Sequence, residues 1–412
     1  MPTSPPATTL PTIKISRRGA DRLRDGHVWI YRSDLISADG ISPGALVRVT
    51  DERGKFLGAA LYSSASQIAI RLISRHHEAV ADFLPVLRER IQQAIAYRDG
   101  VLHLNEAHIT DAYRVIFSEA DFLPGLIVDR YNDLLSLQIL TQAMDAEPVR
   151  QTVLAELTEK FHPAAIAERT DPKIRELEQL PPRPSSLLQG DKAATIFTMN
   201  GVKFHFDALA GQKTGAFLDQ RENYAAAAEY AHGEALDIFC YQGGFALHLA
   251  RKCSQVTGVD SSRPALEVAE RNAALNVSLD PGNMNGQEIE WIEANAFDLL
   301  RDYAAAGRQY DTIVLDPPAF AKSKKTLDTA LRGYKELNLR ALKMLRPGGI
   351  LVTCSCSYHV SQADFLEVLA QASRDVHRTL RILENRGQAK DHPTLLTVPE
   401  TAYLKCLIVD VR

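Results

Sequence analysis

The chain has 412 residues, of which 45% are hydrophobic and 24% charged, and its formal net charge at pH 7 is -4. These values lie near the averages of soluble globular proteins, so they exclude a disordered, collagenous or coiled-coil chain, and the length predicts roughly two or three domains. No segment approaches the roughly 18 uninterrupted apolar residues of a membrane span, and Met1 to Pro11 lacks the basic start and apolar run of a signal peptide. We therefore expect a cytoplasmic protein with no membrane segment.

Residues 12–76 are predicted to form a small β-rich module. Short apolar runs alternate there with turn residues, which is typical of a closed or nearly closed β structure. Residues 12–75 carry 11 Lys and Arg against 6 Asp and Glu, so this module is basic although the whole chain is acidic. The strands are expected at Ile13–Ile15, Val28–Tyr31, Ala45–Val49, Phe56–Tyr62 and Ile68–Ile73.

The arginines of this module are candidates for RNA contacts. They are Arg17, Arg18, Arg22 and Arg24, and they precede Trp29 and Tyr31. A basic patch beside aromatic rings suits the RNA backbone and stacked bases. The competing interpretation is a solvated basic face, with Trp29 and Tyr31 on one strand face as part of the core.

Residues 77–195 are predicted to form a central α+β domain. Phe83–Tyr97 has apolar residues at helical spacing, whereas Tyr113–Phe117, Gly125–Asp129 and Leu134–Leu140 read as strands between turn residues. The proline-rich stretch Leu180–Ser186 resembles a stiff linker, and a boundary is expected near it.

Residues 196–412 alternate strands with helices. Apolar strands with helices between them predict a parallel sheet covered on both faces, in a Rossmann-like α/β domain that binds ligands at the carboxyl edge of its strands. The strands are expected at Leu236–Cys240, Val256–Val259, Ile289–Ala294, Thr312–Leu315 and Ile350–Thr353. The helices are expected from the residue after Gly243-Gly244 to Lys252, and at Pro264–Asn276, Phe297–Ala306 and Leu327–Leu345.

Two features indicate the cofactor. The Gly243-Gly244 turn follows the first of these strands, and Asp260 ends the next one, where a carboxylate can accept hydrogen bonds from both ribose hydroxyls. The turn lacks the three-glycine fingerprint that cradles a pyrophosphate, which favours S-adenosylmethionine over NAD. A tight turn found in any Rossmann-like protein is the alternative interpretation of the two glycines.

Two further strand ends carry candidate reactive groups. Asp316 follows one strand and precedes Pro317-Pro318, which can hold the carboxylate toward the crevice. Cys354 and Cys356 follow another strand. A cysteine there can be a nucleophile or simply a small buried hydrophobe. The five cysteines match no zinc spacing, so we expect free thiols and no metal.

Taken together, these motifs resemble the cytosine-5 methyltransferase I family of large-subunit ribosomal RNA, which belongs to the class I S-adenosylmethionine-dependent enzymes. The likeness spans nearly the whole chain, and its front module is similar to a PUA domain. The strings that carry it are Arg24–Ile30, Ser66–Arg71, Ser118–Tyr131, Gly211–Arg221 and Asp237–Phe245, together with Asp316–Phe320 and Ser355–Ser357.

The resemblance implies roles for individual residues. Asp237 and Gly243 would pass beneath the methionine part of the cofactor, Asp260 would hold the ribose, and Asp316 would meet both the cofactor site and the target base. Asn295-Ala296 would contact adenine, with an amide where the family more often has a carboxylate. The methionine and adenosine side would be lined by Lys213, Thr214, Phe217, Asp219, Gln220 and Arg221.

The resemblance also implies a reaction, methylation of carbon 5 of a cytosine in 23S ribosomal RNA. That carbon is a poor nucleophile until a thiolate adds to carbon 6. Ser355-Cys356-Ser357 matches the family motif, so Cys356 is the expected nucleophile and Cys354 the reserve, because residues two apart share a strand face. Ala319 stands where related enzymes carry a second cysteine, which predicts a one-cysteine mechanism.

Two other functions stay open at this point. A guanine-nitrogen RNA methyltransferase would share the Asp-Pro-Pro motif but would need no thiol. A noncatalytic RNA-binding assembly factor would keep the front module and transfer no methyl group. The family likeness also favours a homodimer, with ribosomal RNA or an assembly intermediate as the partner.

Overall fold

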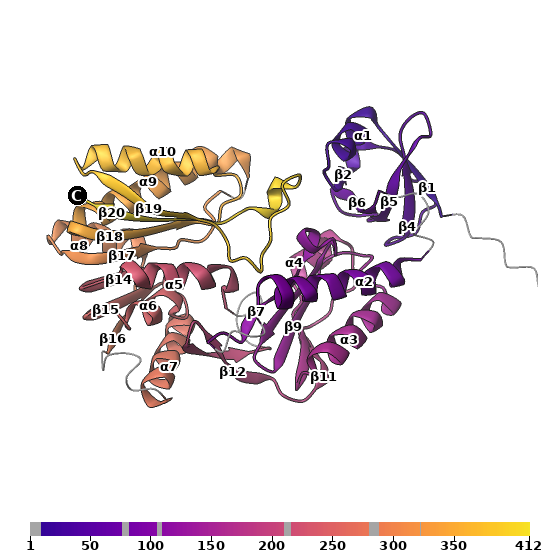
Figure 1. Cartoon of the computed structure of the whole chain (residues 1–412). Coiled ribbons are helices and arrows are strands. Elements are labelled where there is room, and N and C mark those ends of the chain that lie inside the picture. Colours follow the sequence, from indigo (N-terminus) through magenta and orange to yellow (C-terminus); the bar gives the residue numbers. More distant parts are fainter. Residues whose placement is uncertain (1–9, 76–81, 105–108, 210–215, 280–287, 322) are drawn as a thin grey trace, which may run out of the picture. The chain divides into compact units, whose positions relative to one another are not determined.

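The computed structural model describes residues 10–75, 82–104, 109–209, 216–279, 288–321 and 323–412, which pack as two compact units. The N-terminal unit takes the chain up to Thr195 together with two later segments, Phe206–Gly215 and Asp391–Thr401. The C-terminal unit takes Ile196–His205, Ala216–Lys390 and Ala402–Arg412. Figure 1 shows the elements of both units.

The N-terminal unit begins with a six-stranded sheet, which confirms the predicted β-rich module. Its neighbouring strands are antiparallel except for one parallel pair, β1 and β4. Buried aliphatic residues from successive strands, among them Ile13, Ile30, Val47 and Ile70, form its core. In sheet order the strands are β2 (Trp29–Tyr31), β6 (Ile68–Ser74), β5 (Phe56–Tyr62), β4 (Leu46–Thr50), β1 (Thr12–Ile15) and β3 (Leu35–Ser37).

A helix that the sequence analysis did not predict crosses this module. The helix, α1, spans Arg17–Arg24 and carries all four candidate RNA-binding arginines. Ser16 caps its first turn by accepting a hydrogen bond from the Gly19 amide, and its apolar face buries Ala20 and Leu23. The arginines therefore project from a helix that is fixed to the core on its other face.

The rest of the N-terminal unit is the central α+β fold. Its five-stranded sheet is antiparallel except for the parallel pair β9 and β10. Apolar residues of α2 and α3, such as Leu87, Ile91 and Val153, pack in its core. The elements are α2 (Phe83–Ala96), β7 (Ala112–Phe117), β8 (Leu126–Tyr131), β9 (Leu134–Ile139), α3 (Glu147–Phe161), β10 (Ala165–Glu168), α4 (Pro172–Leu177) and β11 (Ser186–Gly190).

A hairpin that lies mostly in the C-terminal unit follows, and a late segment of the chain belongs to the N-terminal unit. The hairpin pairs β12 (Ala194–Met199) with β13 (Val202–Asp207) through an Asn200-Gly201 turn in which both residues have positive φ. The segment Asp391–Thr401 packs within the N-terminal unit, where the Asp391 carboxylate accepts a 2.7 Å hydrogen bond from the Arg114 amide. The predicted division at residues 76 and 195 stays a prediction.

The C-terminal unit is built on a seven-stranded sheet. Five strands are parallel, and the chain enters at β14, moves outward to β16 and then returns to β17 on the other side of β14. The switch of direction lies between β14 and β17, where open α/β sheets bind their ligands. In sheet order the strands are β16 (Ile289–Glu293), β15 (Gln255–Asp260), β14 (Glu234–Ile238), β17 (Tyr310–Leu315), β18 (Leu345–Ser355), β20 (Lys405–Val411) and β19 (Leu380–Arg386).

The expectation of a fully parallel sheet is wrong at one edge. The last strand, β20, runs antiparallel between β18 and β19, both of which it contacts along its length. An antiparallel strand needs no crossover helix, so the final segment of the chain can pair with its neighbouring strands without one. The sheet is therefore mixed, although the five strands around the switch point are parallel as predicted.

Helices cover both faces of this sheet (Figure 1). Side chains of α8, α9 and α10 share one core with inward residues of the strands, such as Leu236, Leu315 and Leu407. The other face carries α5, α6 and α7. The helices are α5 (Arg221–Tyr230), α6 (Gly244–Leu249), α7 (Arg263–Leu279), α8 (Ala296–Ala305), α9 (Leu327–Met344) and α10 (Gln362–Asp375). In the part of the chain that the structure describes, no helix has the length and apolar character of a membrane span.

Candidate active site

The loop after β14 forms the floor of the candidate cofactor site. Phe239, Tyr241 and Gly243 all have positive φ, at 68°, 49° and 86°. Only glycine adopts that region without cost, so the two aromatic residues store roughly 1–3 kcal/mol each. The amides of Phe239 and Cys240 donate to the Val259 carbonyl at 2.9 and 3.0 Å, which holds the loop in this conformation. Strain of this kind concentrates at ligand sites.

The Asp260 carboxylate is oriented by the backbone. Its Oδ2 accepts from the Tyr241 amide at 3.0 Å, and its Oδ1 accepts from the Ser262 amide at 2.8 Å. A carboxylate has about four acceptor sites, so both oxygens can still accept from two ribose hydroxyls. The side chain is half-buried at the carboxyl end of β15, where the sequence places the ribose contact.

Asp237 is the most perturbed carboxyl of the site. It is fully buried, and its Oδ2 accepts a 2.8 Å hydrogen bond from the Ala246 amide. Among the described residues its Oδ1 has no partner. Burial, with smaller contributions from Asp316 and Asp260, raises the pKa of Asp237 to about 8. A buried oxygen without a partner, near the carboxylates of Asp316 and Asp260, fits a ligand that brings positive charge and hydrogen-bond donors. S-adenosylmethionine, with its ammonium and sulfonium groups, is such a ligand.

The two glycines of the turn have different roles. Gly243 is the N-cap residue of α6 and has a left-handed backbone, so a side chain there would be strained. A Cβ at Gly244 would lie 2.5 Å from the Tyr224 hydroxyl oxygen. Gly244 is thus required by the packing of Tyr224. This supports the interpretation of the two glycines as a tight turn, and not as a place where the backbone approaches a ligand.

The segment before α5 carries several of the candidate residues. Gln220 is buried, and its Nε2 donates to Asp316 Oδ1 at 3.0 Å. Asp219 accepts a 2.6 Å hydrogen bond from the Tyr403 hydroxyl, and the Phe217 ring meets the Tyr241 ring edge-on at 5.1 Å. Arg221 is buried at the start of α5. Lys213 and Thr214 lie outside the described residues.

Asn295 and Ala296 stand at the start of α8. The Asn295 Oδ1 accepts from the amides of Phe297 and Asp298 at 2.9 and 3.3 Å, so it caps the helix. Asn295 is exposed and Ala296 is buried. The carbonyl oxygen of Asn295 therefore has a structural role, and its amide nitrogen is the part of the side chain left for the expected adenine contact.

The structure distinguishes the two cysteines that spacing could not separate. Cys354 lies inside β18, is fully buried opposite Cys406, and its pKa is raised well above the ordinary value by burial. Cys356 lies beyond the end of β18 and is half-buried, with its Sγ 3.8 Å from the Pro317 carbonyl oxygen. Cys356 therefore contacts the Asp316-Pro317 loop from beyond the strand end, whereas Cys354 is buried within the strand, where Gln220 and Asp316 influence its pKa.

The loop that carries Cys356 is anchored by groups that sequence reasoning missed. The Ser357 Oγ accepts from the Ala321 amide at 3.1 Å and lies 3.0 Å from the Tyr334 hydroxyl. The Ser357 carbonyl accepts a 2.7 Å hydrogen bond from the Lys405 ammonium. One feature of the sequence could have indicated this contact: Lys405 is the first residue of the largely apolar run Lys405–Val411. A lysine is unusual in a strand that is buried along its whole length.

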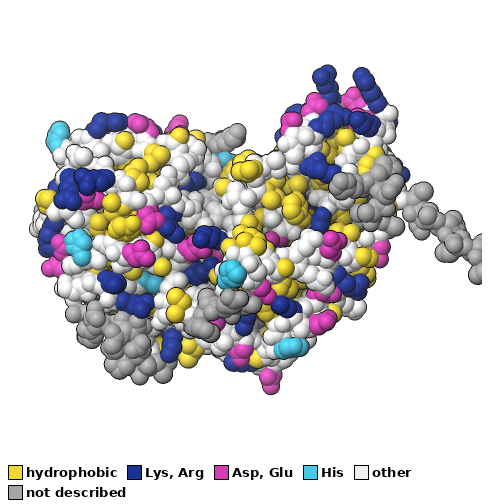
Figure 2. Space-filling model, in the orientation of Figure 1, with side chains coloured by type: hydrophobic (Ala, Val, Ile, Leu, Met, Phe, Trp, Pro, Cys, Tyr) yellow, Lys and Arg dark blue, Asp and Glu magenta, His cyan; other side chains and the backbone are white. Residues whose placement is uncertain are grey.

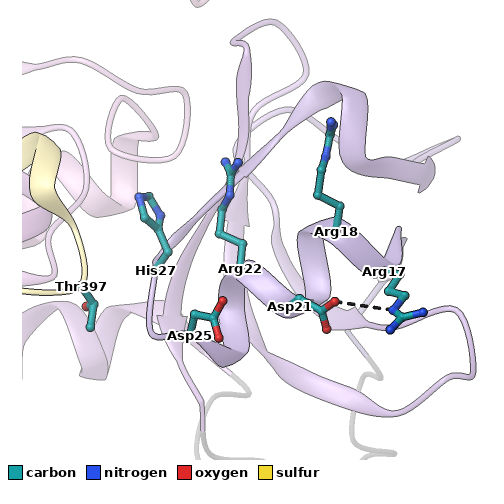
Figure 3. Close-up of a pocket in the computed structure, with 7 residues that line it drawn as sticks. All are labelled: Arg17, Arg18, Asp21, Arg22, Asp25, His27 and Thr397. Carbon is teal, nitrogen blue, oxygen red and sulfur yellow. Dashed lines mark ion pairs between the residues drawn. The ribbon is translucent and has the colours of Figure 1, made fainter. Parts of the chain in front are cut away.

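The candidate RNA surface lies on α1 of the N-terminal unit. Figure 2 shows Lys and Arg side chains gathered over this part of the molecule, and Figure 3 shows Arg18 and Arg22 extending to the same side of the helix. A pocket of about 630 Å³ is lined by Arg17, Arg18, Asp21, Arg22, Asp25, His27 and Thr397.

Acidic residues neutralise part of this surface. Arg18 pairs with the buried Asp34 at 2.6 Å, and Arg24 pairs with Asp51 at 2.7 Å. Arg22 instead stacks over the Tyr31 ring, 4.4 Å from its centroid. Tyr31 and Trp29 are both half-buried, and the Trp29 indole donates to Glu119 at 3.1 Å. The basic patch beside an aromatic ring is therefore present, but part of its charge serves the fold.

Comparison with known families agrees with this geometry. Residues 13–75 match the model of a PUA-like domain, and residues 132–409 match that of an S-adenosylmethionine-dependent methyltransferase. The crystal structure of SMU.776 in complex with SAH has a TM-score of 0.80 and 18% identity, and the match covers 97% of this chain and 100% of that one. The chain is an S-adenosylmethionine-dependent methyltransferase with an N-terminal PUA-like domain, and the predicted fold class and cofactor are confirmed.

Sequence relatives define the family more narrowly. The chain is 38% identical over 405 residues to the ribosomal RNA large subunit methyltransferase I of Shewanella frigidimarina, a match that covers 97% of this chain and 99% of the relative. It is 36% identical over 394 residues to the protein of that name from Photobacterium profundum, with 93% and 95% covered. The chain therefore belongs to the ribosomal RNA large subunit methyltransferase I family.

Proposed function

We propose that this protein methylates carbon 5 of a cytosine in 23S ribosomal RNA, with Cys356 as the nucleophile. The substrate class follows the names of the relatives, and the choice of cytosine rests on the thiol. The observation that carries it is the position of Cys356, which is half-buried and has its Sγ 3.8 Å from the carbonyl oxygen of Pro317, the residue after Asp316. A guanine-nitrogen methyltransferase needs no cysteine there.

The thiol supplies the step that cytosine requires. The Cys356 thiolate adds to carbon 6 of the ring, so that carbon 5 becomes enamine-like and can accept a methyl group. Bound S-adenosylmethionine supplies that methyl group from its sulfonium. Loss of the proton from carbon 5 then expels the thiolate and restores the ring.

Asp316 is proposed to face ring nitrogen 3 of the target base. It follows β17 directly, its amide donates to the Ile238 carbonyl at 3.3 Å, and Gln220 holds its Oδ1 at 3.0 Å. A carboxyl group fixed in this way can stabilise the charge that develops on the ring during thiolate addition. Gln220 thereby acts as the positioning residue of Asp316.

The test of this function is a map of modified nucleosides. We expect 23S RNA from cells lacking the protein to lose one 5-methylcytidine, and the gene on a plasmid to restore it. Mass spectrometry of nuclease fragments identifies base, atom and position together. Loss of a methylguanosine instead would contradict this proposal and support methylation of guanine nitrogen. An unchanged pattern of RNA modification would support a noncatalytic RNA-binding role.

RNA binding through α1 gives a second expected result. Affinity for a 23S RNA fragment should fall steeply with salt, and the double variant Arg17→Ala/Arg22→Ala should flatten the log–log slope by about 1–2, since each phosphate contact releases counterions. Fluorescence anisotropy across a potassium chloride series measures the slope. Arg301→Ala, which removes an exposed arginine from α8, is the control. Equal slopes for the double variant and the wild type would show that these arginines form a solvated surface and do not contact RNA phosphates.

A further inference from the structure

Lys405 is a buried cation beside the candidate nucleophile. It begins β20, is 7% exposed, and its Nζ donates to the Ser357 carbonyl at 2.7 Å and to the Tyr403 carbonyl at 2.9 Å. These two bonds use two of the three ammonium protons. Among the residues that the structure describes, no carboxylate forms an ion pair with Lys405.

An ammonium buried without a counter-ion is costly, and burial lowers the pKa of Lys405 to about 8. The one charged neighbour that raises this pKa is Cys356. Lys405 also lies opposite Ser355 in the β18–β20 register, one residue before the cysteine. An ionised Cys356 would therefore supply the counter-ion that the carboxylates among the described residues do not provide.

We infer that Lys405 is a positioning residue that holds Cys356 as a thiolate before the RNA binds. This inference rests on the proposed role of Cys356 as the nucleophile. An amine with a pKa near 8 is mostly ammonium at pH 7, and its positive charge favours ionisation of the Cys356 thiol: the S–H bond breaks, the proton passes to solvent, and the pair becomes thiolate and ammonium. The hydrogen bonds to Ser357 and Tyr403 hold the ammonium in place.

The other titratable groups around the pair do not take over this role. Tyr334 reaches the loop from α9 through Ser357, and burial raises the pKa of its phenol, so it stays neutral. Cys354 and Cys406 are buried, and burial raises the pKa of the Cys354 thiol. On β19, Arg386 pairs with Glu384 and donates to Asn223 at 2.9 Å.

The test is the pH dependence of alkylation of the free, full-length protein by iodoacetamide, followed at Cys356 by peptide mass spectrometry. A free cysteine ionises near pH 8.5, so a thiolate favoured by one pKa unit reacts up to about tenfold faster at pH 7. We expect wild type and Lys405→Arg to show this faster rate. Lys405→Gln, which can still donate to Ser357 but is uncharged, should react about tenfold more slowly at pH 7 and equally fast at pH 10.

The outcomes separate this inference from the proposed function. Equal alkylation rates for wild type and Lys405→Gln at pH 7 would overturn the role of Lys405, whatever the methylation result. Unchanged cofactor affinity and melting temperature of Lys405→Gln show that the loop is intact. If the variants do not fold, the wild-type profile alone decides, because a midpoint at or above pH 8.5 would contradict a stabilised thiolate.

Discussion

Cys356→Ala is expected to abolish methyl transfer to undermodified 23S RNA, with a loss of at least about 10³-fold in rate, because alanine cannot add to carbon 6 and leaves carbon 5 unreactive. Cofactor affinity should stay within about twofold of wild type, since Cys356 is not among the residues proposed to contact S-adenosylmethionine. Transfer of labelled methyl groups and calorimetric titration with the cofactor measure the two effects separately.

The neighbouring cysteine provides the matched control. Cys354→Ala removes a thiol that is fully buried inside β18. We expect activity to survive and the free energy of unfolding to fall by about 1 kcal/mol, the typical effect of a small core truncation. A dead Cys354→Ala with an active Cys356→Ala would reverse the nucleophile assignment. Full activity in both variants would remove the thiol mechanism altogether.

The parallel core of the sheet could be predicted from sequence because its strands are short apolar runs that end in polar residues. Val256–Val259 lies within β15, and Thr312–Leu315 lies within β17. Asp260 and Asp316 follow from this pattern, since the carboxyl ends of parallel strands meet at one edge of the sheet. The candidate cofactor crevice therefore depends mainly on local information.

What the sequence could not provide depends on contacts between distant residues. The position of β20 beside β18 joins Lys405 to Ser355, 50 positions earlier, and no local pattern reports that pairing. The difference between Cys354 and Cys356 also needed the end of β18. The helix α1 was missed because its eight residues include four arginines and only a short apolar stripe.

A second large effect is expected at Asp237, through stability and pH. An ordinary aspartate has a pKa near 3.8, whereas that of Asp237 is raised to about 8 in the folded protein. Between these values the folded state keeps a proton that the unfolded chain has released. The contribution of Asp237 to stability is therefore largest below pH 4, falls as the pH rises toward 8, and is constant above it.

Asp237→Asn should remove this dependence, because an amide is neutral at every pH used. Each pKa unit corresponds to about 1.4 kcal/mol, so the variant should gain up to about 5 kcal/mol relative to wild type between pH 4 and pH 9. The measurement is urea unfolding at several pH values. Asp302→Asn is the control, since that carboxylate is 68% exposed. Parallel pH curves for Asp237→Asn and wild type would contradict a buried, protonated carboxyl.

The same substitution should harm the cofactor site, which explains why a destabilising acid is kept there. Positive charge arriving with S-adenosylmethionine favours the ionised carboxylate, so binding to wild type should release a proton and tighten as the pH rises toward 8. Asp237→Asn should bind the cofactor about 10- to 100-fold more weakly and without that pH dependence, the scale of a lost hydrogen bond to a charged group. Calorimetry in buffers of different ionisation enthalpy counts the released protons. If the wild type releases no proton on binding, the proposed contact between Asp237 and the cofactor is wrong.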